Sequence, residues 1–455
     1  MPKNVLLFAT AAIAGCLASL EPAMAQEAAE AATEMAAATG GTTAPETAFI
    51  LNSLSFLMHG FLVMFMAAGF CMLESGLVRS RSVATICTKN IALYAFAGIM
   101  YYIVGYNLMY AGVDGGYMGT FSWFSPDDTA ALGGDYSGGY SSLSDWFFQM
   151  VFVATTASIV SGTVAERSKL WTFLIFVLVL TAIIYPIEGS WTWGGGWLSE
   201  MGFSDFAGST IVHSTGGWAA LVGAIVIGAR KGRFGADGRS HPMPGSSLPL
   251  ASLGTFILWL GWFGFNGGSQ LAMGTAADVI AISHIYANTN LAACGGLAAA
   301  MLAAQIVFKK VDLTMALNGA LAGLVSITAE PLAPSMGGAI IIGAVGGVLV
   351  VVTVPILDKL RIDDVVGAIP VHLVCGIWGT FAVPFSNSDA SFGTQIIGIV
   401  SIGIWVTVAS AIVWLILKFT MGVRLDPEAE DIGADRAELG LEAYPEFGSG
   451  ASQRL

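Results

Sequence analysis

The stretch DFAGSTIVHSTGG at residues 205–217 has a counterpart, DVVGAIPVHLVCG, at residues 364–376. Both follow the pattern Asp-x2-Gly-x4-His-x3-Gly, and each opens an apolar run that is long enough to cross a bilayer. The first copy opens the fifth such run of the chain, and the second copy opens the tenth. Because five is odd, two halves of five spans cross the membrane in opposite directions. The repetition therefore predicts an inverted repeat with a site near the midplane, between the halves.

The composition is typical of an all-α polytopic membrane protein. Of the 455 residues, 55% are hydrophobic and only 11% are charged, whereas a typical soluble domain has about 25% charged residues. These values exclude a disordered chain, and the five Cys residues include no CxxC pair that would suggest a redox or metal motif. We expect eleven transmembrane helices, at about 48–78, 83–112, 143–165, 169–186, 206–229, 248–267, 278–308, 312–328, 337–357, 365–384 and 396–422.

The basic residues predict how these spans are oriented. Of the 18 Lys and Arg residues, all except Lys3 fall at or beyond the ends that we assign to the cytoplasmic side. Because cytoplasmic loops carry such an excess, we predict that the N-terminus lies outside and the C-terminus inside. The chain has a net charge of -13 and no basic face, which argues against nucleic acid as a partner.

The N-terminus has the features of a secretory signal peptide, namely Lys3, an apolar run and the small-x-small site Ala23-Met24-Ala25. A lipoprotein site at Ile13-Ala14-Gly15-Cys16 is the alternative. A signal of this kind predicts a bacterial protein whose mature N-terminus leaves the cytoplasm, and the spans that follow predict a multi-pass protein of the inner membrane. The predicted segments are a signal peptide (1–25), a flexible periplasmic leader (26–47), a first five-helix repeat (48–229), a cytoplasmic linker (230–247), a second five-helix repeat (248–384), an eleventh helix with its preceding loop (385–424) and a cytoplasmic tail (425–455).

Two histidines carry the strongest functional signal. His213 and His372 occupy the same place in the two copies of the repeat, each at least two turns inside a span. Ionisable residues at such depth usually face a cavity and mark a pathway. A metal site is the rival interpretation, but no third ligand has a suitable spacing. Asp205 and Asp364 precede the two spans, where Asp is a favoured helix N-cap.

Aromatic residues gather at three predicted outer ends. Phe148 and Phe152 share one face of span three, Trp193 lies in an outer loop, and Trp262 and Phe265 end span six. One interpretation is an interfacial aromatic belt, and the other is a site where ring faces attract a monovalent cation. The composition favours neither. We expect no acidic side chain from spans three or six, so such a cation site would be weak and semi-selective.

Several motifs resemble those of the ammonium transporter family (Amt/Mep/Rh). The resemblance runs in family order from Gly69 to Tyr444, nearly the whole mature chain, and the motifs together are specific although single Gly-rich pieces are weak. The matching stretches are 148–152 (FQMVF), 162–167 (GTVAER), 193–196 (WGGG), 205–208 (DFAG), 261–266 (GWFGFN) and 371–376 (VHLVCG).

The resemblance implies a role for each matching residue. It implies an outer ammonium site, a stacked aromatic gate, a twin-His pair in a narrow pore, and supporting residues around them. It implies a homotrimer with one pore per protomer, in membrane lipid, and a cytosolic PII-type protein that blocks the inner mouth. No catalytic residue, metal or cofactor is implied. The residues are Phe148, Trp193 and Ser269 (site), Phe152 and Phe265 (gate), His213 and His372 (twin-His), and Asp205, Trp262, Asn266 and Thr328 (supporting).

The function implied by the resemblance is ammonium transport, with deprotonation outside, ammonia conduction through the pore and a proton relay on the histidines. The alternatives are an electroneutral channel for ammonia or carbon dioxide, and an ammonium-sensing receptor. An enzyme is not expected, because the motifs assemble no nucleophile–base pair. Leu373 replaces a common Gly and is expected to narrow or reshape the inner pore. Leu439 and Leu441 replace polar residues, which makes control by a PII-type protein less secure than transport.

Overall fold

A computed structural model describes residues 45–237 and 239–445. The predicted signal peptide, the alternative lipoprotein site and most of the leader lie outside the described residues. Within those ranges the chain is helical, and its only β contacts are two isolated bridges. This confirms the all-α fold class.

Nine helices of the described chain are long and apolar enough to cross a membrane. Two predicted spans, the eighth and the tenth, correspond to the shorter apolar helices Leu313–Ile327 and Ile369–Phe385. The count of eleven spans and their orientation stay predictions. The principal helices are α3 (Pro45–Leu77), α4 (Val83–Met100), α5 (Tyr106–Tyr110), α7 (Ser142–Thr163), α8 (Leu170–Val179), α9 (Tyr185–Ser190), α11 (Thr215–Ile227), α12 (Leu248–Gly268), α13 (Ala276–Val307), α14 (Leu313–Ile327), α15 (Met336–Lys359), α16 (Cys375–Ala382) and α17 (Phe392–Thr420), with the short α6 (Thr129–Leu132), α10 (Trp197–Glu200) and α18 (Pro427–Ile432).

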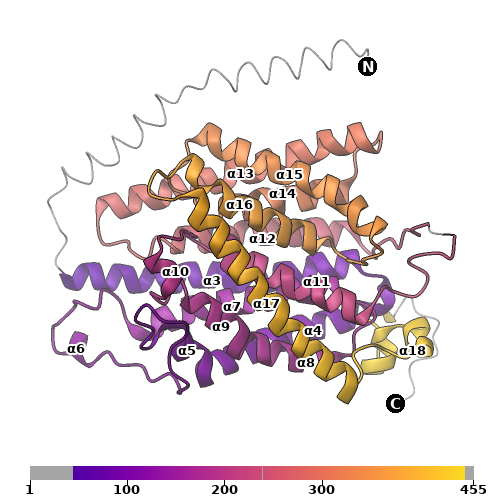
Figure 1. Ribbon diagram of the computed structural model, residues 1–455, viewed down its shortest axis with the longest axis horizontal. Helices are drawn as coiled ribbons and strands as arrows, with labels where there is room; N and C mark the ends of the chain where they lie inside the picture. The colour runs from indigo at the N-terminus through magenta and orange to yellow at the C-terminus, as the bar shows by residue number, and fades with distance from the viewer. Residues whose placement is uncertain (1–44, 238, 446–455) are drawn as a thin grey trace, which may run out of the picture.

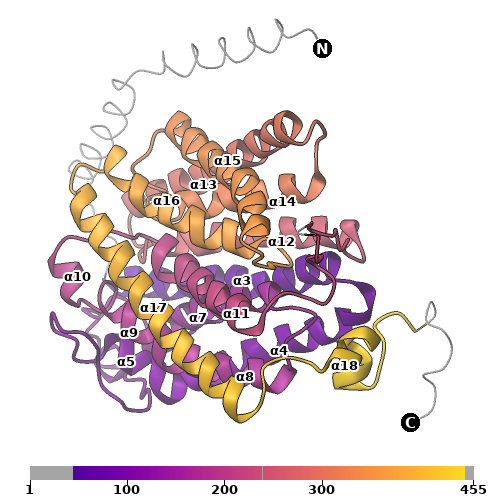
Figure 2. The same cartoon turned by 45° about the vertical axis from the view of Figure 1, so that its right-hand side comes forward.

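The two halves of the chain form neighbouring groups of helices. The later group, α13 to α16, lies beside the earlier group, α3 to α11, and α17 runs obliquely across both (Figures 1 and 2). In Figure 1, α6 and α10 lie at one end of the bundle and α18 lies at the other. The two predicted outer loops that contain α6 and α10 therefore share one end of the molecule, opposite α18 of the C-terminal tail.

Glycines allow the long helices to approach closely. α3 packs along α12, and a Cβ added at Gly254 of α12 would collide with the backbone of Leu73. In the other half, a Cβ at Gly343 of α15 would collide with the carbonyl of Ala292 in α13. Helices in lipid associate without a hydrophobic driving force. Small residues at their contacts allow the close van der Waals packing that holds them together instead.

The two copies of the repeat fold alike, and both differ from the regular helices predicted. Gly208 (φ +104°) and Gly367 (φ +81°) adopt the left-handed conformation that favours glycine. Each is followed by a π-helical turn, η4 (Ser209–Ser214) and η5 (Ile369–Val374), before the regular α11 and α16 begin. The π-turns, which are frequent at functional sites, contain the two repeat histidines.

Candidate functional site

A cavity of about 320 Å³ opens at the predicted outer end of the bundle. The three residues that the resemblance implies for substrate binding all line it. Phe148 comes from α7, Trp193 from the loop after α9, and Ser269 from the end of α12. The remaining lining residues are Tyr106, Tyr110, Tyr140, Asp145, Gln149, Phe152, Phe206 and Leu271.

Aromatic rings and a hydroxyl define the chemistry of this cavity. The ring centroids of Phe148 and Phe152 lie 4.9 Å apart in an edge arrangement. The Trp193 ring stands at 87° to Phe152 with centroids 6.0 Å apart, and its Nε1 donates a 2.9 Å hydrogen bond to the Asp205 carbonyl. The Ser269 hydroxyl donates to the Phe265 carbonyl over 2.8 Å, so its oxygen can accept from a ligand.

One acidic side chain joins this cavity, contrary to the prediction. Asp145 lies in the first turn of α7 and lines the cavity, with only 6% of its surface exposed. The Tyr106 hydroxyl donates to it, as does Gln149 Nε2 over 3.2 Å. The expectation of no acidic group from span three was therefore wrong. The signal in the sequence was the i,i+4 spacing of Asp145 and Gln149, beside the Phe148 motif.

Two buried rings lie next to the cavity. The centroids of Phe152 and Phe265 are 4.1 Å apart, and the side chains are 1% and 0% exposed. Phe265 in turn lies 5.2 Å from the His213 ring. The pair thus lies between the outer cavity and the histidines.

The two repeat histidines meet in the interior. Their Nδ1 atoms lie 3.2 Å apart and the rings stack at 28°. The ring of Trp262 also stacks on His213, at 4.9 Å. In neutral imidazoles one Nδ1 must donate and the other accept, so the pair shares one proton across this contact. The buried His213 Nε2 has no hydrogen-bond partner among the described residues, and it is free to meet a small polar molecule.

The residues implied as supporting are buried and mostly hydrogen-bonded. Trp262 Nε1 donates to Thr328 Oγ1 over 2.8 Å, which fixes the ring that stacks on His213. Asn266 Nδ2 donates to Thr289 Oγ1 over 2.9 Å. Asp205 does not line the outer cavity. Its carboxylate accepts the N–H groups at the start of η4, and it therefore sets the backbone that carries His213.

Below the histidines, the structure corrects the expectation for Leu373. This side chain does not line the cavity next to His372. It packs with Ala220, Ala224 and Leu357, and a Cβ on Gly217 would collide with it. Leu373 therefore packs at the contact between the two repeats, away from the lining of the cavity beside His372.

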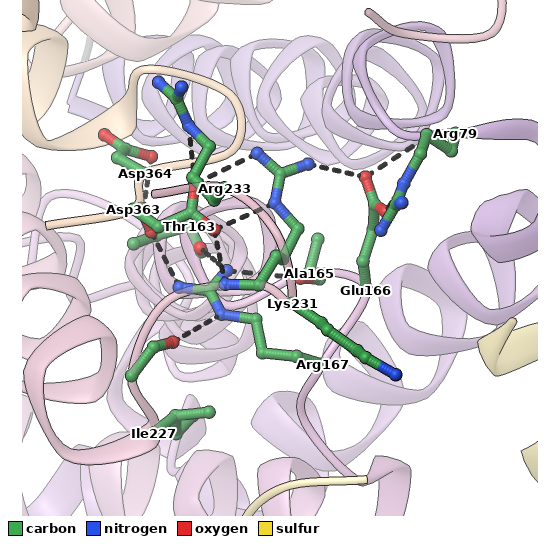
Figure 3. A network of polar contacts seen from close by, with 12 residues as sticks. Arg79, Thr163, Ala165, Glu166, Arg167, Ile227, Lys231, Arg233, Asp363 and Asp364 are labelled. Carbon is green, nitrogen blue, oxygen red and sulfur yellow. Dashed lines mark hydrogen bonds and ion pairs between the residues drawn. The ribbon is translucent and has the colours of Figure 1, made fainter. Parts of the chain in front are cut away.

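A buried ionic network closes the predicted cytoplasmic end (Figure 3). Arg230 pairs with Glu166 at 2.7 Å and with Asp363 at 2.9 Å, and Arg79 pairs with the same glutamate. Burial alone would raise the pKa of Asp363, but its hydrogen bonds to Arg230 and the nearby Arg167 charge hold that pKa at about 2. Burial lowers the pKa of Arg167 to about 10, which still leaves it protonated at neutral pH. Asp363 and Arg167 therefore both stay charged at neutral pH.

The C-terminal tail attaches to this end through carboxylates. Asp435 accepts from the Thr85 N–H over 2.7 Å and from the Thr85 hydroxyl over 2.8 Å, at the start of α4. Glu438 accepts from Leu170 N at the start of α8, and Glu430 accepts from Lys231 N. Anionic groups at helix N-termini are stabilising, so the tail holds the first turns of α4 and α8, at their predicted inner ends.

The other histidines have structural partners. His59 contacts Ser55 and the Tyr286 hydroxyl, each at 3.0 Å, and His284 contacts the Pro334 carbonyl. Within residues 45–237 and 239–445, no group of three or more His, Cys, Asp or Glu side chains is arranged to hold a metal ion.

Comparison with known proteins places this architecture in a family. A family model described as "Ammonium Transporter Family" matches residues 54–444. The chain is 40% identical to Ammonium transporter Amt2 of Archaeoglobus fulgidus over 422 residues, which cover 86% of this chain and 87% of that protein. It is 42% identical to a putative ammonium transporter of Synechocystis sp. over 410 residues, which cover 89% and 91%.

Solved structures agree with the sequence comparison. A structure titled "Sensor Amt Protein" is similar, with a TM-score of 0.80 and 34% identity, and the match covers 86% of this chain and 98% of that one. Candida albicans Mep2 gives a TM-score of 0.75 and 25% identity, with coverage of 90% and 94%. A family match over most of the chain and relatives at about this identity lead to one conclusion: the chain is a member of the ammonium transporter family.

Proposed function

We propose that this protein moves ammonium across the bacterial inner membrane by separating it into ammonia and a proton. Ammonium is recruited in the outer cavity by the faces of Phe148 and Trp193 and by the Ser269 oxygen. It loses its proton there, ammonia passes the Phe152 and Phe265 rings, and the His213–His372 pair relays the proton. The observation that carries this proposal is the 3.2 Å contact between two buried Nδ1 atoms directly beyond the ring pair.

The apolar interior supplies the selectivity in this scheme. Carrying a bare cation through hydrocarbon costs several kcal/mol or more. Potassium cannot lose its charge, whereas ammonium can, so an interior that admits only neutral ammonia rejects potassium. An imidazole suits the relay because it both donates and accepts a proton.

A current measurement tests the proposal. Purified protein in proteoliposomes is given an ammonium jump, with an equal potassium jump and empty liposomes as controls. We expect an inward current with ammonium alone. A rise in internal pH without current would support the electroneutral gas channel. If folded protein gave neither a current nor a change in internal pH, the result would support the ammonium-sensing receptor.

Asp145 is expected to strengthen the outer site, because a carboxylate beside the aromatic rings attracts a cation that the rings alone hold weakly. We expect Asp145→Asn to raise the half-saturating ammonium concentration about tenfold, equivalent to about 1.4 kcal/mol. The current is measured over a series of ammonium concentrations. Asp127→Asn is the control, because Asp127 is exposed and does not line the cavity. An unchanged half-saturating concentration in Asp145→Asn would remove this residue from the site.

The same proposal includes the assembly and the partner implied by the family resemblance. The protein forms a homotrimer in membrane lipid, with one pore per protomer. A cytosolic PII-type protein binds at the inner mouth, near the tail residues 425–445. The attachment of that tail through Asp435 and Glu438 supports a defined inner surface for such a partner.

Ammonium sensing is the second candidate function. The observation that favours it is the similarity to a structure titled "Sensor Amt Protein", which the chain matches at a TM-score of 0.80. A sensor would bind ammonium in the same outer cavity and would signal through a separate partner. The proteoliposome measurement separates the two, because a sensor binds ammonium without passing current.

A further inference from the structure

A small cavity lies on the inner side of the histidine pair. Its volume is about 10 Å³, and it is lined by His372, Glu74, Ser158 and Asn318, among apolar residues. A space of this size with several polar groups holds about one water molecule. Glu74, near the inner end of α3, is the only carboxylate in the lining.

Glu74 is buried but incompletely hydrogen-bonded. It is 1% exposed, and its Oε2 accepts from Ser161 Oγ over 2.8 Å and from Asn90 Nδ2 over 3.2 Å. Its Oε1 has no hydrogen-bond partner among the described residues. A buried carboxylate oxygen without a partner costs free energy that a purely structural role does not explain. A water in the cavity next to His372 would satisfy it.

A positive charge balances this carboxylate within the membrane. Lys89 of α4 is also 1% exposed, and its Nζ donates to the Ser161 carbonyl over 3.0 Å. The same ammonium lies 4.1 Å from the centre of the Phe173 ring. Ser161 therefore bridges the two charges, with its hydroxyl on Glu74 and its carbonyl on Lys89. The other titratable groups near the carboxylate are Cys71 of α3, Cys87 of α4 and His372 of η5.

The small cavity adjoins a route to the cytoplasmic end. Asn318, Val366 and Gly367 line both the small cavity and a larger one of about 320 Å³. The larger cavity is also lined by Arg230 and Asp312, at the predicted inner face. Glu74 thus lies between the histidine pair and the cavity from which ammonium would leave.

We propose that Glu74 is the inner proton acceptor of the pathway, a role that rests on the proposed function. An imidazolium at His372 gives its proton to the water in the small cavity, and that water gives a proton to the Glu74 carboxylate. Neutral Glu74 then protonates an ammonia molecule that has arrived below the histidines. Ammonium leaves through the larger cavity, and the carboxylate and the neutral His372 are restored.

The test replaces the carboxylate while keeping its shape. We expect Glu74→Gln to lower the ammonium-evoked current by about a hundredfold or more, the lower end of what the loss of an acid–base group costs, while ammonia still enters and raises internal pH. Glu74→Asp keeps the carboxylate and is expected to retain more current than the Gln variant. A structural role predicts the opposite order, because Gln matches the shape of Glu. Glu330→Gln is the control, a buried carboxylate in the loop after α14 that lines none of these cavities.

The outcomes separate this proposal from the proposed function. If the wild type carries current and Glu74→Gln carries the same current, the role of Glu74 is overturned and transport stands. If the Gln variant retains more current than the Asp variant, Glu74 is structural. If the wild type carries no current, no proton crosses, and both the relay and the role of Glu74 are overturned.

Discussion

Replacing both pore histidines, in the variant His213→Ala with His372→Ala, is expected to abolish the ammonium-evoked current. The two imidazoles are stacked between Phe265 and the cavity of Glu74, and they form the titratable link between these points. Without them a proton has no group to bind in this apolar stretch, so we expect the current to fall below about one hundredth of the wild-type value. The measurement is the proteoliposome current after an ammonium jump.

Ammonia flux distinguishes a lost relay from a lost fold in this variant. Two small side chains replace two rings, so the pore stays open, and internal pH is expected to rise after the jump. His284→Ala is the matched control, because His284 lies within α13, contacts the Pro334 carbonyl in the loop before α15 and belongs to no predicted site. Undiminished current in the double variant would contradict the relay.

The positions of the long helices could be predicted from the sequence, because a run of apolar residues directly indicates a segment that crosses a membrane. Helix positions follow the predicted ranges to within a few residues, and the repeat located both histidines. The π-helical turns at Ser209–Ser214 and Ile369–Val374 could not be predicted. They depend on which backbone N–H groups the carboxylates of Asp205 and Asp364 accept, and hydropathy contains no information on this.

Some parts of the site were predictable from motifs and others were not. The pair Phe152 and Phe265 and the pair His213 and His372 were predictable, because the family resemblance implies each of these residues individually. Asp145 was missed although it lies inside the predicted span 143–165, because only the fold shows that its side chain lines the outer cavity. Glu74 was missed for a similar reason, since its role depends on Ser161 and Asn90, which are distant in the chain.

In both halves an Asp carboxylate accepts hydrogen bonds from the backbone that leads to the repeat histidine, but the number of these bonds differs. The Asp364 carboxylate accepts from Gly367 N and Ile369 N, and from the Thr163 hydroxyl. The Asp205 carboxylate accepts from four successive N–H groups, those of Gly208, Ser209, Thr210 and Ile211, at 2.8 to 3.2 Å. Asp205 therefore fixes more backbone N–H groups than Asp364 does.

Asp205→Ala is accordingly expected to remove both folded protein and transport. All four donors are buried, and each hydrogen bond to a charged acceptor contributes about 1.5–3 kcal/mol. The loss of all four amounts to about 6–12 kcal/mol, which is comparable with the whole stability of a typical fold, and η4 carries His213. We expect little monodisperse protein in size-exclusion chromatography, and no ammonium-evoked current from what remains.

An exposed helix cap provides the comparison for this variant. Asp312 accepts from Thr314 N and Met315 N at the start of α14, in an exposed position. There the freed N–H groups bond to water, so Asp312→Ala costs only about 1 kcal/mol, and the yield of folded protein is expected to stay near wild type. Both residues cap a helix, and they differ in burial. A larger loss of folded protein in Asp205→Ala than in Asp312→Ala would therefore be due to the burial of the Asp205 contacts. If Asp205→Ala gave a normal yield and current, the carboxylate would not be what holds the His213 backbone, and the four short contacts would have to be replaceable by water.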